Sequence, residues 1–255
     1  MSAVEVHRVV EGPEDAPVLV LSNSLGSMLT VWDPQIPALI EHFRVVRYDL
    51  RGHGASPVPP GPYDIADLGA DLLGVLDVLG VERAHLCGLS LGGIVSMWVA
   101  AHAPERVDRL VLCCASAWFG TPENWLDRAA TVRRKGTAAV AETVVARWFT
   151  PGFAQRHPET VARMRSMVGA TPAEGYASCC EVVARTDMRP SLPSIGAPTL
   201  VIAGAQDPAA LPAQAVELAG GIPAARLVMV EDAAHLANVE QPDEVTELIL
   251  GALRA

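Results

Sequence analysis

Residues 88–93 read Gly-Leu-Ser-Leu-Gly-Gly and constrain the fold more than any other part of the chain. They lie between an apolar run at 84–87, typical of a strand, and a helix-like segment at 94–102. In that setting the pattern G-x-S-x-G forms a sharp turn with the serine exposed at its apex. Gly88 and Gly92 leave the space that the turn needs, and N–H groups at the helix start can stabilise an oxyanion beside Ser90. A small-residue turn with an idle serine is the alternative, and the flanking elements argue against it.

Strand-like and helix-like segments alternate along most of the chain. Apolar runs bounded by turn residues predict strands at 4–10, 18–21, 43–48, 84–87, 110–114, 199–203 and 226–230. Helical periodicity predicts helices near 32–42, 65–79, 94–102, 214–219 and 243–253. Apolar strands that alternate with helices imply an α/β fold, with a mainly parallel sheet and helices on both of its faces.

The segment 120–190 differs from the rest, because strand-like runs vanish and helical periodicity dominates. Val140, Val144 and Trp148, for example, recur at i, i+4 and i+8. We therefore expect a core formed by 1–119 and 191–255, with 120–190 inserted as a helical cap. Open α/β sheets bind ligands at the carboxyl edge of their strands, and we expect the cap to cover that edge.

The charge of the chain limits its partners. A net charge of −10 argues against nucleic acid or an anionic membrane surface. The charge is uneven, since 120–190 holds ten Arg or Lys and seven Asp or Glu, whereas the remainder is acidic. A mildly basic segment on an acidic body can guide an anionic substrate. The alternative is that these arginines only solvate exposed helix faces.

The sequence favours a cytoplasmic protein. No apolar run approaches the ~18 residues that a membrane span needs, and 1–10 resembles a strand more than a secretory signal. The five cysteines include two adjacent pairs. Neighbouring strand residues face opposite ways, so neither pair predicts a disulfide or a metal site, and we expect buried thiols. We infer no obligate protein partner.

A nucleophilic serine needs a histidine to accept its proton and a carboxylate to orient that histidine. After a turn of this kind, the acid and then the histidine follow in chain order. Asp207 and His235 fit, because each follows a predicted strand and so comes at the carboxyl edge of the sheet. Asp232 shares a loop with His235, which makes it a weaker partner, and the alternative role for Asp207 is to cap its own turn. We expect His53 to brace its loop.

An attacking serine also requires two converging backbone N–H groups that bind the oxyanion. One belongs to the residue after the serine, which is Leu91. The second belongs to the loop after the strand at 18–21, where we expect Leu25 to be the donor.

Several motifs together resemble the α/β-hydrolase superfamily: the turn at 88–93, Asp-Leu-Arg-Gly-His-Gly at 49–54, Gly204-x-x-Asp207, and His235. That superfamily usually has His-Gly in its oxyanion loop, and here the corresponding residues at 23–24 are Asn and Ser.

A finer resemblance is to 3-oxoadipate enol-lactonases of bacterial aromatic catabolism. It rests on Ser-Asn-Ser-Leu-Gly at 22–26, Arg-Tyr-Asp at 47–49, Cys-Gly-Leu-Ser-Leu-Gly-Gly at 87–93 and Arg-Trp-Phe at 147–149. It extends over nearly the whole chain. The resemblance implies hydrolysis of a small anionic lactone, an enol ester that carries a carboxylate, to 3-oxoadipate. It implies no metal and no organic cofactor.

The implied substrate carboxylate calls for an arginine in the cap, and the candidates are Arg133, Arg134 and Arg147. Trp118 and Trp148 are candidates for the pocket wall, although packing within the cap is the alternative for Trp148. Two other functions stay open. One is an ester hydrolase or perhydrolase of the same fold that acts on uncharged acyl groups. The other is a ligand-binding receptor with a hydrolase-like pocket.

Overall fold

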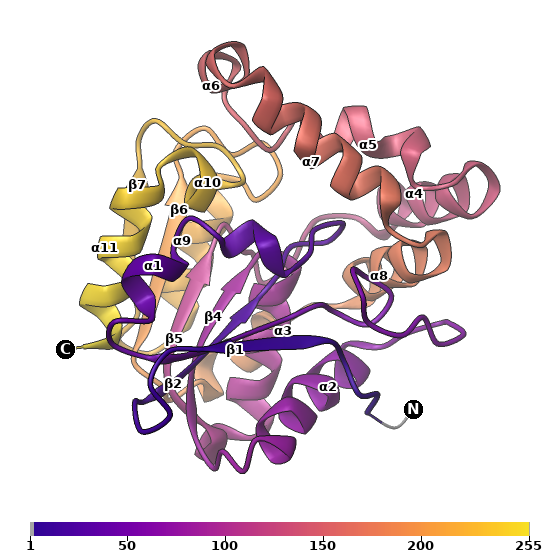
Figure 1. Ribbon diagram of the computed structural model, residues 1–255. Coiled ribbons are helices and arrows are strands. Elements are labelled where there is room, and N and C mark those ends of the chain that lie inside the picture. The colour runs from indigo at the N-terminus through magenta and orange to yellow at the C-terminus, as the bar shows by residue number, and fades with distance from the viewer. Residues whose placement is uncertain (1–2, 255) are drawn as a thin grey trace.

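The computed structural model describes residues 3–254; residues 1, 2 and 255, which the predicted core includes, lie outside this range. A seven-stranded sheet runs through the molecule (Figure 1). Its strand order is β1-β3-β2-β4-β5-β6-β7. Its strands are β1 (Arg8–Glu11), β2 (Val18–Ser22), β3 (Arg44–Tyr48), β4 (Ala84–Leu89), β5 (Val107–Cys113), β6 (Thr199–Gly204) and β7 (Arg226–Val230). Strand β1 is antiparallel to β3, and the other neighbouring pairs are parallel. The prediction of a mainly parallel sheet is confirmed.

Two predicted elements are shorter than the sequence indicated. The first strand begins at Arg8 and not at residue 4, because its partner β3 ends at Tyr48, directly opposite Arg8. The helix expected at 32–42 is reduced to a 3₁₀ turn, η1 (Leu29–Trp32), and one helical turn, α1 (Ile36–Leu39). Pro34 and Pro37 have no backbone N–H to donate, so they confine helical hydrogen bonding to short pieces.

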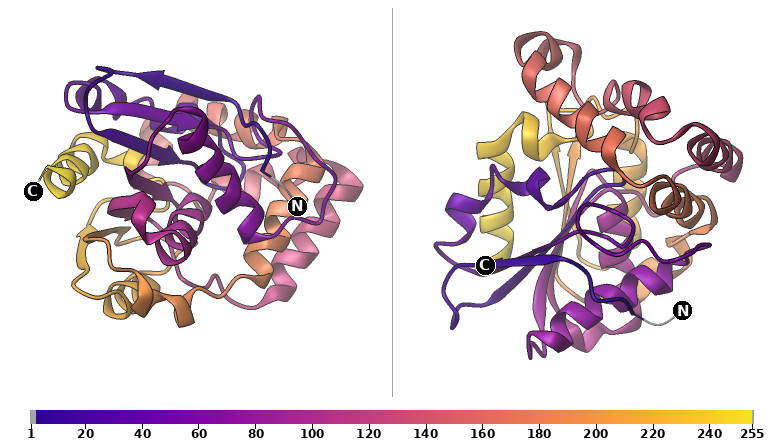
Figure 2. Two further views of the ribbon diagram at one scale, coloured as in Figure 1. Left: turned by 90° about the horizontal axis from the view of Figure 1, so that it is seen from below. Right: turned by 45° about the vertical axis from the view of Figure 1, so that its right-hand side comes forward.

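Helices cover both faces of the sheet (Figure 2). On one face α3 (Leu91–His102) packs against β2, β4 and β5, and α2 (Ile65–Val78) packs against α3. On the other face α11 (Pro242–Leu253) packs against β5 and β6 and contacts α1. Helix α9 (Pro212–Gly221) packs against β6 and β7. Strands β4 and β6 are therefore buried along their whole length.

Five helices connect β5 to β6 and lie together beyond the carboxyl ends of the strands (Figure 1). They are α4 (Pro122–Lys135), α5 (Ala138–Val145), α6 (Pro151–Arg156), α7 (Pro158–Ala170) and α8 (Ala173–Arg185), and we call them the cap. Helix α4 packs against α8, and α5 packs against α7. The remaining short helices are η2 (Pro104–Arg106), η3 (Arg189–Ser194) and α10 (Ala237–Glu240).

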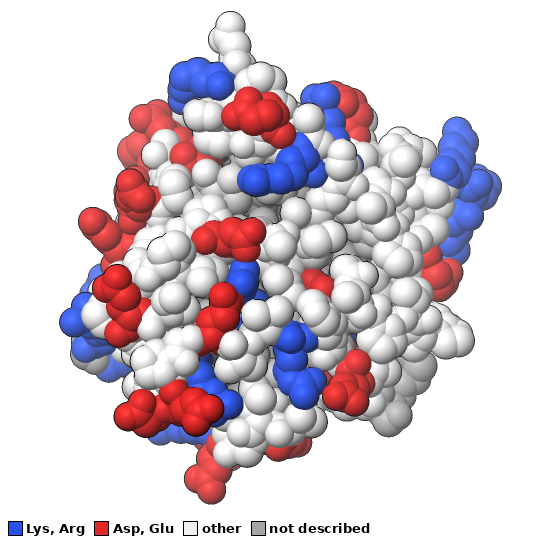
Figure 3. Space-filling model, in the orientation of Figure 1, with Lys and Arg blue, Asp and Glu red and all other residues white. Residues whose placement is uncertain are grey.

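Neither the surface charges nor the cysteines of the described residues indicate a second functional site. Acidic and basic side chains are interspersed over the face drawn in Figure 3. All five cysteines are buried and free, as the sequence predicted. Among residues 3–254, no helix is long and apolar enough to cross a membrane, and no group of His, Cys, Asp or Glu side chains is arranged to hold a metal ion.

Candidate active site

The turn between β4 and α3 holds Ser90 in a backbone conformation that L-residues rarely adopt, with φ 54° and ψ −113°. Space around the turn explains its glycines. A Cβ on Gly88 would lie 2.3 Å from the carbonyl oxygen of Gly92, and a Cβ on Gly92 would lie 2.3 Å from that of Ser22. The amides of Ser90 and Gly92 donate to the carbonyls of Cys113 and Asn23, at 3.0 and 2.9 Å. Neighbouring strands and loops thus hold the serine at the apex.

Three side chains from three different loops form a continuous hydrogen-bonded series. Nε2 of His235 lies 3.0 Å from Oγ of Ser90, and Nδ1 of His235 lies 2.8 Å from Oδ2 of Asp207. All three residues are buried. The other carboxylate oxygen of Asp207 accepts from the amides of Ala209 and Ala210, which fixes the carboxylate in its loop. This is the arrangement in which a histidine can take a proton from a serine.

Asp207, and not Asp232, contacts the histidine. Asp232 is exposed, and its backbone carbonyl accepts from the Gln241 side chain. The carboxylate of Asp207 also affects the pKa of its partner. Burial lowers the pKa of His235, but the charge and the hydrogen bond of Asp207 raise it by more, so the net pKa lies above its ordinary value.

Two backbone amides beside Ser90 remain available to a ligand. Leu25 lines the same cavity as Ser90, and Leu91 is the first residue of α3. Neither amide donates to an acceptor within residues 3–254. Unpaired N–H groups at a helix start and an adjacent loop are the usual donors to an oxyanion.

A buried histidine holds the loop that carries Leu25. The Gly26 amide donates to Nε2 of His53 at 3.0 Å, and Nδ1 of His53 donates to the carbonyl of Arg51 at 3.2 Å. Because Nε2 accepts, the ring is neutral. Burial lowers the pKa of His53 to about 4, which keeps it neutral at physiological pH. The bond to the Arg51 carbonyl confirms the prediction that His53 braces its own loop, and the bond from Gly26 means that it braces a second loop as well.

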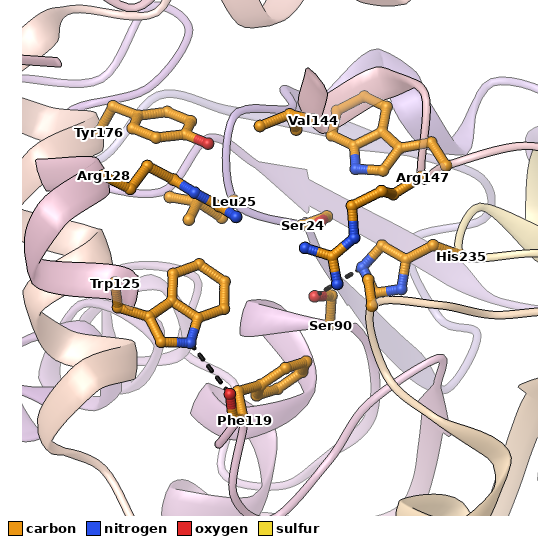
Figure 4. A pocket seen from close by; sticks show the side chains of 12 residues that line it. Ser24, Leu25, Ser90, Phe119, Trp125, Arg128, Val144, Arg147, Tyr176 and His235 are labelled. Carbon is orange, nitrogen blue, oxygen red and sulfur yellow. Dashed lines mark hydrogen bonds between the residues drawn. The ribbon is translucent and has the colours of Figure 1, made fainter. Parts of the chain in front are cut away.

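A cavity lies between this series and the cap (Figure 4). The core contributes Ser90, His235, Leu25 and Ser24 to its wall. The remaining lining residues are Phe119, Trp125, Arg128, Val144, Arg147, Trp148, Tyr176 and Ala209. The wall therefore combines aromatic rings with two cations, and no Asp or Glu of the described residues lines it.

The two arginines enter the cavity from opposite sides of its wall (Figure 4). Arg147 reaches toward Ser90 and His235, and its Nη2 donates to the carbonyl of Pro208 at 2.6 Å. The Arg128 guanidinium lies 4.5 Å from the centre of the Trp125 ring, on the side of the cavity near Tyr176. Burial lowers the pKa of Arg147, and the charge of Arg128 lowers it further.

Three residues predicted to contact a substrate do not line this cavity. Arg133 is bound by Glu174 and Glu181 on the outer side of the cap. Arg134 is exposed near the end of α4. Trp118 lies under the guanidinium of Arg189, 4.5 Å from ring centre to carbon. Arg147 and Trp148 do line the cavity, and Trp148 is also buried against the cap, so its two predicted roles coincide.

Sequence reasoning missed Arg128 and Trp125, although a signal for them exists. Trp125, Ala129 and Val132 follow one another at helical spacing, and the last two are buried. Arg128 lies next to this inward stripe, whereas Arg133 comes five residues later, about 140° further around the helix. Tyr176 has a comparable signal, since it begins a buried stripe with Cys179, Cys180 and Val183 at helical spacing, whereas Phe119 precedes α4 and carries no such pattern.

Comparison with known proteins agrees with this geometry. A sequence model of the alpha/beta hydrolase fold matches residues 17–242. The chain belongs to the α/β-hydrolase family. This hydrolase is 42% identical to 3-oxoadipate enol-lactonase 2 of Acinetobacter baylyi, over 95% of its own length and 91% of the relative's. The predicted family is confirmed.

Two solved structures are similar to this hydrolase over nearly their whole length. The enol-lactonase from Burkholderia xenovorans LB400 is 45% identical, with a TM-score of 0.96 over 98% of this chain and 96% of that one. A thermophilic esterase from Thermogutta terrifontis, solved with malate bound, is 33% identical, with a TM-score of 0.92 over 98% of this chain and 93% of that one. Enol-lactonases and an esterase are thus both among its relatives.

Proposed function

We propose that this α/β hydrolase converts 3-oxoadipate enol-lactone, a cyclic enol ester that carries a carboxylate, to 3-oxoadipate. The observation that carries the proposal is the cavity that Ser90 shares with Arg128 and Arg147, with no acidic residue of the described chain in its wall. Similarity to two enol-lactonases supports this substrate. The malate in the related esterase is a small dicarboxylate, which supports a compact anion as ligand.

In the proposed first step, Oγ of Ser90 attacks the lactone carbonyl carbon while Nε2 of His235 takes the serine proton. Asp207 holds the ring with its proton on Nδ1 and stabilises the imidazolium. The amides of Leu25 and Leu91 donate to the oxyanion. The bond between the carbonyl carbon and the ring oxygen then breaks. The enolate oxygen leaves that carbon but stays in the same molecule, whose acyl end remains on the serine. An enolate is a better leaving group than an alkoxide, so this step depends little on a proton from His235.

In the second step, water attacks the acyl carbonyl and gives one proton to Nε2 of His235. The serine oxygen leaves and regains a proton from the imidazolium. The enol formed on ring opening, which stays part of the acyl chain, carries the first serine proton and tautomerises to the ketone. The reaction consumes one water and yields a second carboxylate, and every proton moves through Ser90, His235 or solvent.

We assign recognition of the substrate's own carboxylate to Arg128. Arg147 lies close to the reacting serine, whereas Arg128 lies on the side of the cavity away from it (Figure 4). A lactone with its carbonyl at Ser90 projects its acidic side chain away from the reacting bond. A charge-assisted hydrogen bond to a planar guanidinium would fix that orientation.

The proposal is tested by comparing kcat/KM for the enol-lactone with kcat/KM for uncharged esters of matching size. Preference for the lactone by at least about tenfold supports it, since one charge-assisted contact, from Arg128 to the substrate carboxylate, distinguishes the two substrates. Equal or better turnover of the neutral esters contradicts it.

A neutral-ester hydrolase is the second candidate, and the similarity to the Thermogutta esterase favours it. The aromatic side of the cavity, with Phe119, Trp125 and Trp148, would suit an apolar acyl group. The same substrate panel decides between the two. Absent or single-turnover hydrolysis of every substrate would instead favour a ligand-binding receptor.

A further inference from the structure

The peptide on each side of His235 is tied to a partner outside its own loop. The Ala234 amide donates to Oε2 of Glu240 at 3.0 Å. The Leu236 amide donates to the carbonyl of Trp148 at 2.9 Å. Trp148 belongs to the cavity wall that the cap supplies. Hydrogen bonds on both sides of His235 therefore connect its backbone to one residue of α10 and one residue of the cap.

The carboxylate of Glu240 also binds a residue of the cap. It accepts from the Thr150 amide at 3.1 Å and from the Thr150 hydroxyl. That hydroxyl also accepts from the Phe153 amide at 3.3 Å, at the start of α6. Thr150 ends the segment 147–150, which carries Arg147 and Trp148 into the cavity. One carboxylate thus binds both the histidine loop and this segment.

The chemistry of this contact requires a carboxylate. Glu240 is buried, and among the described residues no Lys, Arg or His forms an ion pair with it. Its charge is compensated by hydrogen bonds from the two amides and the hydroxyl. A buried charge is tolerated only when donors satisfy it. A glutamine amide in place of Glu240 would direct N–H groups at one of these sets of donors. Part of the hydrogen bonding would then be lost.

We propose that Glu240 is a positioning residue that aligns the cap segment 147–150 with His235. One carboxylate then holds both the segment that contributes to substrate binding and the residue that transfers the proton. The inference rests on the proposed serine mechanism. Glu240 acts through two other segments, since it neither lines the cavity nor touches Ser90. Misplacement of reacting groups by about 1 Å can cost a hundredfold in rate. A small shift of either segment would therefore be measurable.

The test uses Glu240→Gln, with Glu244→Gln as the matched control, because Glu244 is exposed on the next helix. The first readout is the rate of covalent inactivation by diisopropyl fluorophosphate, in which Oγ of Ser90 displaces fluoride from phosphorus and its proton passes to His235. This uncharged probe needs no assumption about the substrate. We expect Glu240→Gln to slow inactivation about ten- to a hundredfold, the size of one broken buried hydrogen bond, and Glu244→Gln to leave it unchanged.

Thr150→Val separates the two halves of the connection and is available if Glu240→Gln does not fold. It removes the hydroxyl contact and keeps the Ala234 contact, so KM for the enol-lactone should rise several-fold while inactivation slows less than threefold. Inactivation by folded Glu240→Gln at the wild-type rate would overturn the inference, as would unchanged lactone KM in Thr150→Val. A wild-type protein that does not react with the probe would overturn the proposed function, and with it this role of Glu240.

Discussion

Arg128 and Arg147 point into one cavity from different parts of the cap, and the charge of the first lowers the pKa of the second. Two cations in one partly buried space repel each other unless an anion enters. Arg147 is also held by the carbonyl of Pro208, directly after Asp207. Arg147 is therefore held by a carbonyl of the core and Arg128 by the face of Trp125, and we assign the ligand carboxylate to Arg128 because it lies on the side of the cavity away from the serine.

Replacing Arg128 should separate charged from neutral substrates. In Arg128→Gln, the desolvated substrate carboxylate loses a charge-assisted hydrogen bond of about 1.5–3 kcal/mol. We expect kcat/KM for the enol-lactone to fall roughly ten- to a hundredfold, with little change for a neutral ester of the same size. Arg133→Gln is the control, because Glu174 and Glu181 already hold Arg133 outside the cavity. A loss in the Arg133 variant that Arg128→Gln does not show would reverse this assignment.

The contrast between these two arginines shows what the sequence can and cannot predict. Strand β7 and the order serine, acid, histidine were predictable, because an apolar run and a chain order are local properties. The inward face of α4 is set by packing against α8, some fifty residues away, so the local stripe of Trp125, Ala129 and Val132 marks a buried face without showing that this face also borders the cavity. The hydrogen bond that connects the cap to the helix after His235 likewise joins Thr150 to Glu240 across 90 residues.

Ser90 and His235 should behave as one catalytic unit. Ser90→Ala removes the nucleophile and His235→Ala removes its base, so each should reduce kcat by several orders of magnitude, toward the ~10⁶ seen for such pairs. The double variant should lose little more than either single one, because the second substitution removes a group that no longer acts. Rate constants for all three variants, with folding checked by circular dichroism, provide the measurement. Additive losses would show that the two residues act separately.

The identity of the acid can be tested without changing its shape. Asp207→Asn keeps the volume but favours the wrong tautomer of His235, which costs about 10⁴ in rate in enzymes of this type. Asp232→Asn alters an exposed side chain of the histidine loop and should cost far less. The two kcat values decide the matter, and the opposite ranking would place the acid in the other loop.

The pH profile should report the same carboxylate. A general base must be neutral, so activity falls as pH drops through the pKa of His235. Burial lowers that pKa and Asp207 raises it by more, so the acid limb of kcat/KM in the wild type should lie above the ordinary pKa of histidine. In Asp207→Asn only burial remains of these two causes, and the residual activity should have its acid limb at lower pH. An unshifted limb would show that another group titrates.

His53 should make the fold sensitive to acid. Its pKa is about 4 in the folded protein and near 6.5 when unfolded, so between these values the unfolded chain binds more protons. Its contribution to stability is therefore complete above about pH 6.5 and is lost as pH falls toward 4, on the order of 3 kcal/mol in total.

His53→Gln keeps an acceptor for the Gly26 amide but does not titrate. Its free energy of unfolding, measured in urea from pH 7.5 to 4.5, should fall less steeply than that of the wild type. His157→Gln, at an exposed position that does not contact Gly26, is the matched substitution for comparison. Parallel curves for the wild type and His53→Gln would mean that the buried ring is not the source of acid sensitivity.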